Sequence, residues 1–112
     1  MVADISRILT AVRNEYQLPE DVFLGPRREQ RIVRARQVAM FFLRHISDLS
    51  YSEIGMEMGG YHRTTVMNNC DRVVVLYETN RGFRHRVYAL WKRLEPNRAF
   101  PKPELLLSRW AA

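Results

Sequence analysis

The amino-acid sequence predicts an all-α fold, a compact bundle of about six helices. Apolar residues recur at helical spacing along most of the chain, and no segment alternates between apolar and polar residues as a β-strand does. Glycines, prolines and small polar residues stand between the helical segments, where helices begin and end. A length of 112 residues and a hydrophobic fraction of 46% suit one domain with one core.

The first half of the chain predicts three helices. They are expected at about residues 5–16, 19–23 and 30–45. Asp4 is a suitable N-cap for the first, and Pro19 suits the first turn of the second. Gly25 and Pro26 then break the chain. The third helix is apolar on almost all sides in its second half, which predicts that it is the buried central helix.

The second half predicts three more helices and a tail. The helices are expected at about residues 50–58, 61–79 and 83–94. Ser50 followed by Glu53 forms a capping box at the start of the fourth helix, and Gly59-Gly60 ends that helix. Because three prolines follow Leu94, we expect a domain at 1–94 and a proline-containing C-terminal tail at 95–112.

The fourth and fifth helices, joined by a tight glycine turn, form a helix-turn-helix. The fifth helix carries an apolar stripe through Val66, Cys70 and Val73, and its opposite side is polar. A helix that enters the major groove by its N-terminus presents its first turn to base edges, and the backbone N–H groups there can hold a phosphate. The candidate DNA contacts in this motif are Ser52, Tyr61, His62, Arg63, Thr64, Thr65, Asn68 and Arg72.

A basic cluster precedes the central helix. The net charge is +6, and Arg supplies all but two of the 18 basic residues. Arg is favoured for phosphate and guanine recognition because its planar fork donates two parallel hydrogen bonds, although a GC-rich genome also raises Arg content. Taken alone, a charge run is usually a solvated face, but together with a helix-turn-helix it favours DNA binding. The candidate residues of this cluster are Arg27, Arg28, Gln30, Arg31, Arg34 and Arg36.

Several other function classes are disfavoured by the sequence. Cys70 is the only cysteine, so neither an intrachain disulfide nor a thiolate metal site is expected, and the three histidines are scattered. No nucleophile–base pair or carboxylate pair stands out, so we expect no enzyme, no cofactor and no small-molecule substrate. No apolar run approaches the ~18 residues of a membrane span, and no signal peptide is visible. A cytoplasmic, nucleoid-associated protein is expected.

Three segments resemble the C-terminal DNA-binding domain, domain IV, of the bacterial replication initiator DnaA. Residues 36–40 match its Arg-Gln-x-Ala-Met motif, 49–55 resemble its Ser-Leu-Pro-Glu-Ile-Gly helix, and 59–66 stand where it carries Gly-Gly-Arg-Asp-His-Thr-Thr-Val. The motifs keep the family's order over about residues 5–94. The chain is therefore identified as a stand-alone relative of that domain. The resemblance implies an all-α helix-turn-helix fold of the DnaA domain IV and Trp-repressor-like kind.

The resemblance also implies roles for individual residues. Thr64 and Thr65 occupy positions that contact base and phosphate, and Arg36 and Arg44 occupy positions that contact the DNA backbone. Gln30 aligns with the family's minor-groove basic residue, and a basic residue follows it directly.

The family's Arg-Asp-His, which reads the DnaA box, is replaced by Tyr61-His62-Arg63. The resemblance therefore implies DNA binding but a changed target sequence. No phosphate-binding loop of the GxxxxGK[ST] type is present, so no ATPase is expected. We expect sequence-specific binding of double-stranded DNA that regulates replication initiation or transcription in a bacterium or phage. The alternative is a protein-interaction adaptor, whose partner is DnaA or a DnaA-related ATPase regulator rather than DNA.

Overall fold

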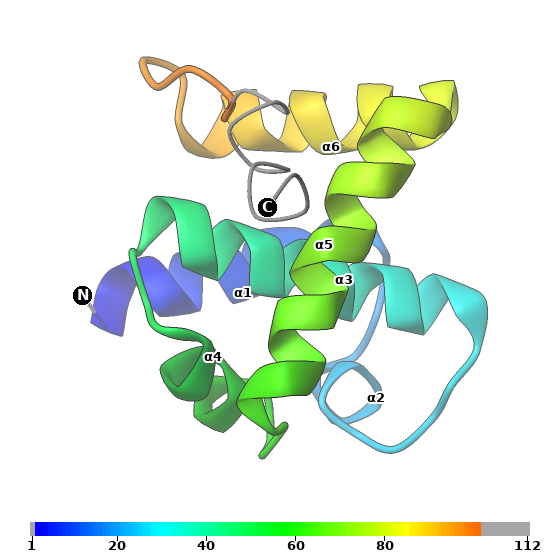
Figure 1. Cartoon of the computed structure of the whole chain (residues 1–112), viewed down its shortest axis with the longest axis vertical. Helices are drawn as coiled ribbons and strands as arrows, with labels where there is room; N and C mark the ends of the chain where they lie inside the picture. Colours follow the sequence, from blue (N-terminus) through cyan, green and yellow to red (C-terminus); the bar gives the residue numbers. More distant parts are fainter. Residues whose placement is uncertain (1, 102–112) are drawn as a thin grey trace, which may run out of the picture.

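The computed structural model describes residues 2–101, and the side chains of residues 4–101 (Figure 1). This part of the chain is all-α, as predicted, and contains no strand. The helices are α1 Val2–Glu15, α2 Glu20–Phe23, α3 Gln30–Ile46, α4 Tyr51–Glu57, α5 Arg63–Thr79 and α6 Arg81–Leu94. None of them is long and apolar enough to cross a membrane.

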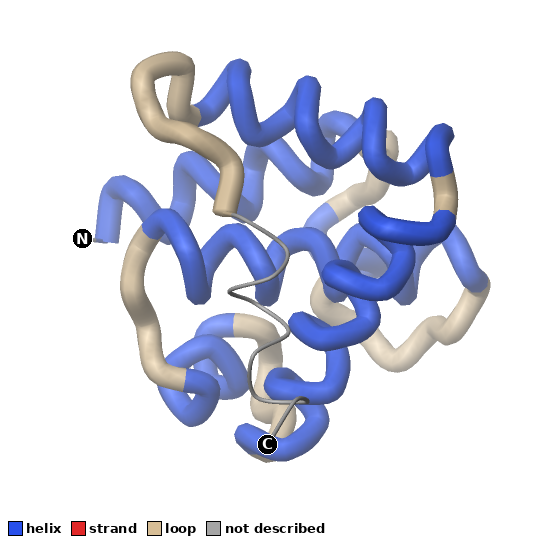
Figure 2. The backbone as a smooth tube through the Cα atoms, turned by 45° about the horizontal axis from the view of Figure 1, so that its top comes forward, coloured by secondary structure: helices blue, strands red, loops and turns tan. Residues whose placement is uncertain are grey.

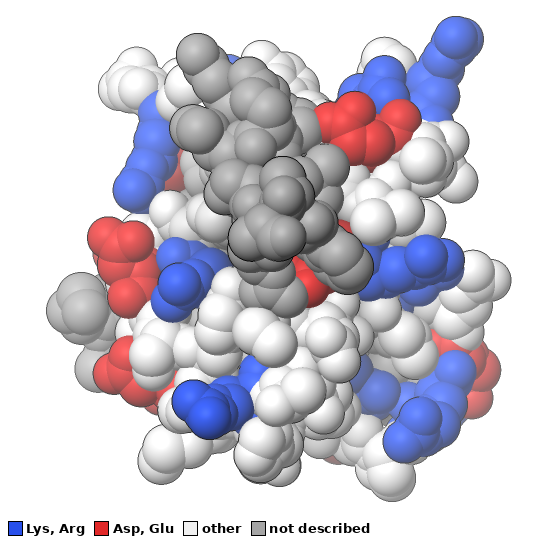
Figure 3. Space-filling model, viewed as in Figure 1, with Lys and Arg blue, Asp and Glu red and all other residues white. Residues whose placement is uncertain are grey.

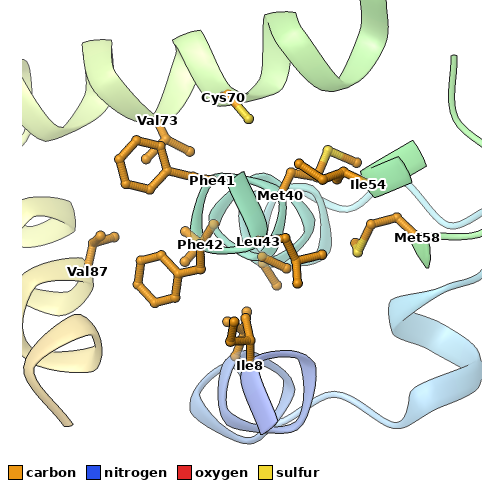
Figure 4. Packing of buried hydrophobic residues seen from close by; sticks show 14 of the residues in the cluster. Ile8, Met40, Phe41, Phe42, Leu43, Ile54, Met58, Cys70, Val73 and Val87 are labelled. Atoms are coloured by element: carbon orange, nitrogen blue, oxygen red, sulfur yellow. The ribbon is translucent and has the colours of Figure 1, made fainter. Parts of the chain in front are cut away.

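Helix α3 is the centre of the core. It packs against α1, α2, α4 and α5, and its residues Val38 to Leu43 are all buried. Figure 4 shows its apolar side chains pointing outward in several directions, toward Ile8 of α1, Ile54 of α4 and Val73 of α5. The prediction that the second half of this helix is buried at the centre of the fold is therefore confirmed, because residues 38–43 are buried whichever side of the helix they occupy.

Helix α5 runs past α3 and carries α6 at its far end (Figure 1). Residues 95–101, which we expected to belong to the tail, fold back from α6 toward α3 (Figure 2). The indole Nε1 of Trp91 donates to the Arg98 carbonyl at 2.9 Å, and Arg98 donates to the Ile46 carbonyl at 3.1 Å. The Phe100 ring stacks on Tyr77 with 4.5 Å between ring centroids. Residues 102–112 of the expected tail lie outside the described residues.

Two helix starts near the N-terminus differ from the sequence-based expectation. Helix α1 begins at Val2, so Asp4 lies in its first turn, where a negative charge is favoured, and is not its N-cap. Helix α2 begins at Glu20 with Pro19 as the N-cap residue, and no side chain caps it.

Helix α6 starts two residues earlier than expected. The side chain of Asn80 accepts a hydrogen bond from the backbone N–H of Phe83 at 2.9 Å, so Asn80 is the N-cap and α6 starts at Arg81. The turn expected at 80–82 is therefore reduced to a single residue between α5 and α6.

Candidate nucleic-acid interface

The first helix of the motif, α4, starts with the predicted capping box. Ser50 Oγ accepts from the backbone N–H of Glu53 at 3.1 Å, and Glu53 Oε1 accepts from the backbone N–H of Ser50 at 2.8 Å. The hydrogen bond that the Glu53 carboxylate accepts from the Ser50 backbone N–H is the largest cause that lowers the pKa of Glu53. The start of α4 is therefore fixed by two reciprocal bonds.

The turn between α4 and α5 depends on glycine. Gly59 and Gly60 both have φ near +100°, a region that L side chains rarely adopt. The backbone N–H groups of Gly60 and Tyr61 both donate to the Gly55 carbonyl, at 2.8 and 3.0 Å. A Cβ on Gly55 would collide with the Tyr61 carbonyl, so the turn lies directly against α4. This close contact sets the direction in which α5 leaves the turn.

Helix α5 begins at Arg63 and is capped by a histidine. His62 is its N-cap, and the ring Nδ1 accepts the backbone N–H of Thr64 at 3.1 Å. Tyr61 and His62 therefore precede the helix, whereas we expected the helix to begin at Tyr61. The predicted core stripe is buried, and the polar candidates lie on the exposed side. The exposed candidates of this helix are Arg63, Thr64, Thr65, Asn68 and Arg72.

The connection between α2 and α3, which we call the basic loop (residues 24–29), is held in shape by Arg36. The Arg36 side chain is buried, with 6% of the residue exposed. Its guanidinium donates to the carbonyls of Phe23 at 2.7 Å, Val22 at 3.0 Å, Gly25 at 2.6 Å and Arg27 at 2.6 Å. This arrangement favours a role in positioning the basic loop over the DNA-backbone contact that we expected, because four of the five N–H groups of Arg36 donate inside the protein.

Arg44 is also used inside the protein. It is half-buried, donates to the Leu49 carbonyl at 3.0 Å and lies 4.3 Å from the centroid of the Tyr51 ring. These contacts join the end of α3 to the start of α4. This arrangement favours a role in positioning α4 over the backbone contact that we expected.

The remaining basic candidates are accessible. Arg28, Gln30 and Arg31 are exposed, and Arg27 is exposed but paired with Glu29 at 2.6 Å. Arg34 is half-buried and donates to the Gln37 side chain at 3.0 Å. Figure 3 shows basic side chains at the lower right of this face, over the connection between α2 and α3.

A groove of about 610 Å³ separates the basic loop from the start of α5. Its lining residues are Leu24, Gly25, Pro26, Arg28, Val33, Arg36, Met40, Gly59, Tyr61, Thr65 and Asn69. Of the basic cluster, Arg28 and Arg36 line this groove together with Tyr61 and Thr65 of the helix-turn-helix. Gln30, Arg31 and Arg34 line a separate pocket, beside the end of α5 and the start of α6. Ser52 is exposed on α4 but does not line the groove.

Sequence reasoning missed Asn69. Its side-chain Oδ1 accepts from Gln37 at 3.2 Å, and Gln37 in turn accepts from Arg34. Asn69 therefore links the groove wall of α5 to α3. Its spacing of four residues from Thr65, on one side of a helix, is the signal that could have identified it.

The ionisable groups of the described residues give no sign of a metal site. No group of three His, Cys, Asp or Glu residues among them could hold a metal ion.

Burial, together with the neighbouring Arg44, lowers the pKa of His45 to about 4, so its ring packs on Phe41 in the neutral form.

A helix, a glycine turn and a second helix with an exposed polar face define a helix-turn-helix DNA-binding domain. A family model described as the bacterial DnaA protein helix-turn-helix matches residues 5–73, and the chain belongs to this family. The helix-turn-helix of this family is a non-catalytic domain that binds double-stranded DNA.

Curated relatives carry the name chromosomal replication initiator protein DnaA. The chain is 34% identical over 98 residues to the protein of Trichormus variabilis, and this match covers 88% of the chain and 21% of the relative. It is 37% identical over 91 residues to the protein of Lactobacillus johnsonii, and the match covers 81% of this chain and 20% of that relative. It is also 37% identical over 87 residues to the protein of a Synechococcus species, and the match covers 78% of this chain and 19% of that relative. The chain thus spans about a fifth of the length of the relatives it matches.

Proposed function

We propose that this protein binds specific sites in duplex DNA, with the start of α5 in the major groove and the basic loop on the adjacent backbone and minor groove. The observation that carries this proposal is the groove between the two elements. In B-DNA a ridge of sugar and phosphate separates the major groove from the minor groove. A protein groove with a recognition helix on one wall and arginines on the other is a suitable shape for that ridge.

The proposed contacts divide into two kinds. Arg63, Thr64 and Asn68 lie on the exposed side of α5, which can approach base edges in a major groove about 12 Å wide. Phosphate contacts come from Arg27, Arg28, Gln30, Arg31, Arg34, Ser52, Tyr61, Thr65 and Arg72. We assign Arg36 and Arg44 to positioning instead, because their guanidinium groups donate to backbone carbonyls.

Arg63 is the proposed source of a changed target sequence. It is the first residue of α5, is exposed, and can only donate hydrogen bonds. Its best partner in the major groove is guanine, whose O6 and N7 both accept. A target with a guanine opposite Arg63 follows from this chemistry.

We propose a role in the control of replication initiation or of transcription, at the nucleoid in the cytoplasm. The relatives support the replication context by name, but this chain matches only their helix-turn-helix region. The proposal therefore concerns DNA occupancy by this domain, and it assigns no initiator activity to the chain.

Binding to labelled duplex DNA across a range of salt concentrations tests the proposal. Five of the proposed phosphate contacts are arginines, so log K should fall with log salt with a slope of about −4 to −5, at ~0.9 per phosphate that an arginine neutralises. Arg28→Ala and Arg31→Ala should each reduce the slope by about 1. Arg93→Ala, on the exposed face of α6, is the matched control that removes the same charge elsewhere. A slope shallower than about −2, with all variants alike, would refute DNA binding and favour the adaptor.

A further inference from the structure

We propose that His62 reads its base pair only as a hydrogen-bond donor, and that the target therefore carries a guanine opposite it. This inference rests on the proposed function and concerns the same surface. The hydrogen bond by which His62 caps α5 indicates which atom of its ring can contact a base.

The helix cap selects the tautomer of the His62 ring. Nδ1 accepts the backbone N–H of Thr64 at 3.1 Å, so Nδ1 carries no proton. A neutral imidazole has one accepting nitrogen and one N–H. The proton of the capping form is therefore on Nε2, and the ring can only donate from that atom.

The donating atom is on the side of the molecule that the proposal turns toward DNA. His62 is exposed and stands between the glycine turn and the exposed side of α5. Among the residues whose side chains the structure describes, none hydrogen-bonds to Nε2. The capping bond also restricts rotation of the ring, so the direction of the N–H is largely set before DNA binds.

A lone donor distinguishes the bases in the major groove. Guanine presents two acceptors there, whereas cytosine presents an amine that would face the Nε2 proton. Adenine and thymine each offer one acceptor, and that of adenine stands next to an amine. Because Arg63 also only donates, the N-cap residue and the first residue of α5 together select acceptor-bearing edges. We infer guanines on neighbouring base pairs.

Substitution by Asp separates recognition from the cap. His62→Asp keeps an acceptor for the Thr64 N–H, since Asp is a favoured N-cap residue, but its carboxylate cannot donate to DNA. The helix should therefore be at least as stable, while the base preference at this position should change from guanine to cytosine. His62→Ala removes both the cap and the donor and serves as the reference.

The experiment begins with selection of binding sites from random duplexes by the wild-type protein and by His62→Asp. Each guanine of the selected wild-type site is then replaced by 7-deazaguanine, which lacks the N7 acceptor. One replacement should weaken wild-type binding about three- to tenfold and leave His62→Ala unaffected. Independently of DNA, long-range ¹H–¹⁵N spectra of the free protein should show the Nε2-protonated tautomer of His62.

The outcomes separate the two proposals. If the free protein shows an Nδ1-protonated His62 ring, the inference is overturned and the proposed function stands. The same holds if binding is sequence-specific and steeply salt-dependent, but wild type and His62→Ala respond alike to every 7-deazaguanine. Unchanged guanine preference in His62→Asp overturns the inference as well. Loss of all salt-dependent duplex binding overturns both.

Discussion

Replacement of Arg36 should show how the basic loop is held. The guanidinium occupies a buried position and donates to four carbonyls, which lie in α2 and in the loop that follows it. Arg36→Lys keeps the charge and most of the aliphatic stem, but an ammonium has no planar fork and cannot reach the same four acceptors. Arg36→Ala removes the charge and all four bonds.

The magnitude follows from the number of bonds lost. A hydrogen bond from a charged donor contributes about 1.5 kcal/mol or more, but water can reach part of the loop once the side chain is gone. We expect the free energy of unfolding to fall by about 3 kcal/mol for Arg36→Ala and about 2 kcal/mol for Arg36→Lys. For a domain of this size, losses of about 2 to 3 kcal/mol lower the melting temperature by about 10–20 °C.

Urea unfolding followed by circular dichroism measures the stability, and amide hydrogen exchange locates the change. The amides of Phe23, Leu24 and Gly25, which donate to backbone carbonyls of residues 19–22, should lose protection more than those of α5. Arg34→Ala is the control, because Arg34 makes one side-chain bond and should cost less than about 1 kcal/mol. If Arg36→Ala were as stable as wild type but reduced the salt slope of DNA binding by about 1, Arg36 would be a phosphate contact and our reasoning would be wrong.

Three further perturbations test other features. Ser50→Ala should lower the free energy of unfolding by about 1 kcal/mol, because the capping box loses its acceptor; an unchanged urea midpoint would contradict the cap. The pKa of His45 is lowered to about 4, so its stabilising effect is complete above pH 6.5 and is lost as the pH falls toward 4. Wild type should therefore lose about 2 kcal/mol more than His45→Gln between pH 7 and pH 4.5, and parallel pH profiles would refute this. Phe100→Ala should cost about 2 kcal/mol in urea unfolding through lost packing on Tyr77 and Trp91, whereas no effect would place the end of the domain at residue 94.

The helices were predictable because their signals are local. The apolar spacing of α3, the capping box at Ser50 and the glycines of the turn each act within a few residues, so the sequence alone contains them. The start of α5 was less predictable. Histidine is not among the usual N-cap residues, so its ring nitrogen gave no recognisable helix start.

The site was less predictable than the helices because its chemistry depends on distant partners. Arg36 stands in a run of arginines that all look alike in the sequence, and only the position of the α2 carbonyls distinguishes it from Arg34. The same holds for Phe100, whose ring partners come from three different helices. Tertiary position, which local patterns do not encode, decided these roles.

The hydrogen-bonded chain from Arg34 through Gln37 to Asn69 has a consequence for the kind of DNA that fits the protein. It ties α3, whose first turn follows the basic loop, to the groove wall of α5, so the two walls stand at a set spacing. In the proposed binding mode, a duplex lying across both walls must match that spacing with its own groove width. Steps that narrow or widen easily would bind at a lower cost of deformation than stiff ones. Base pairs that no side chain touches would then contribute to the choice of site.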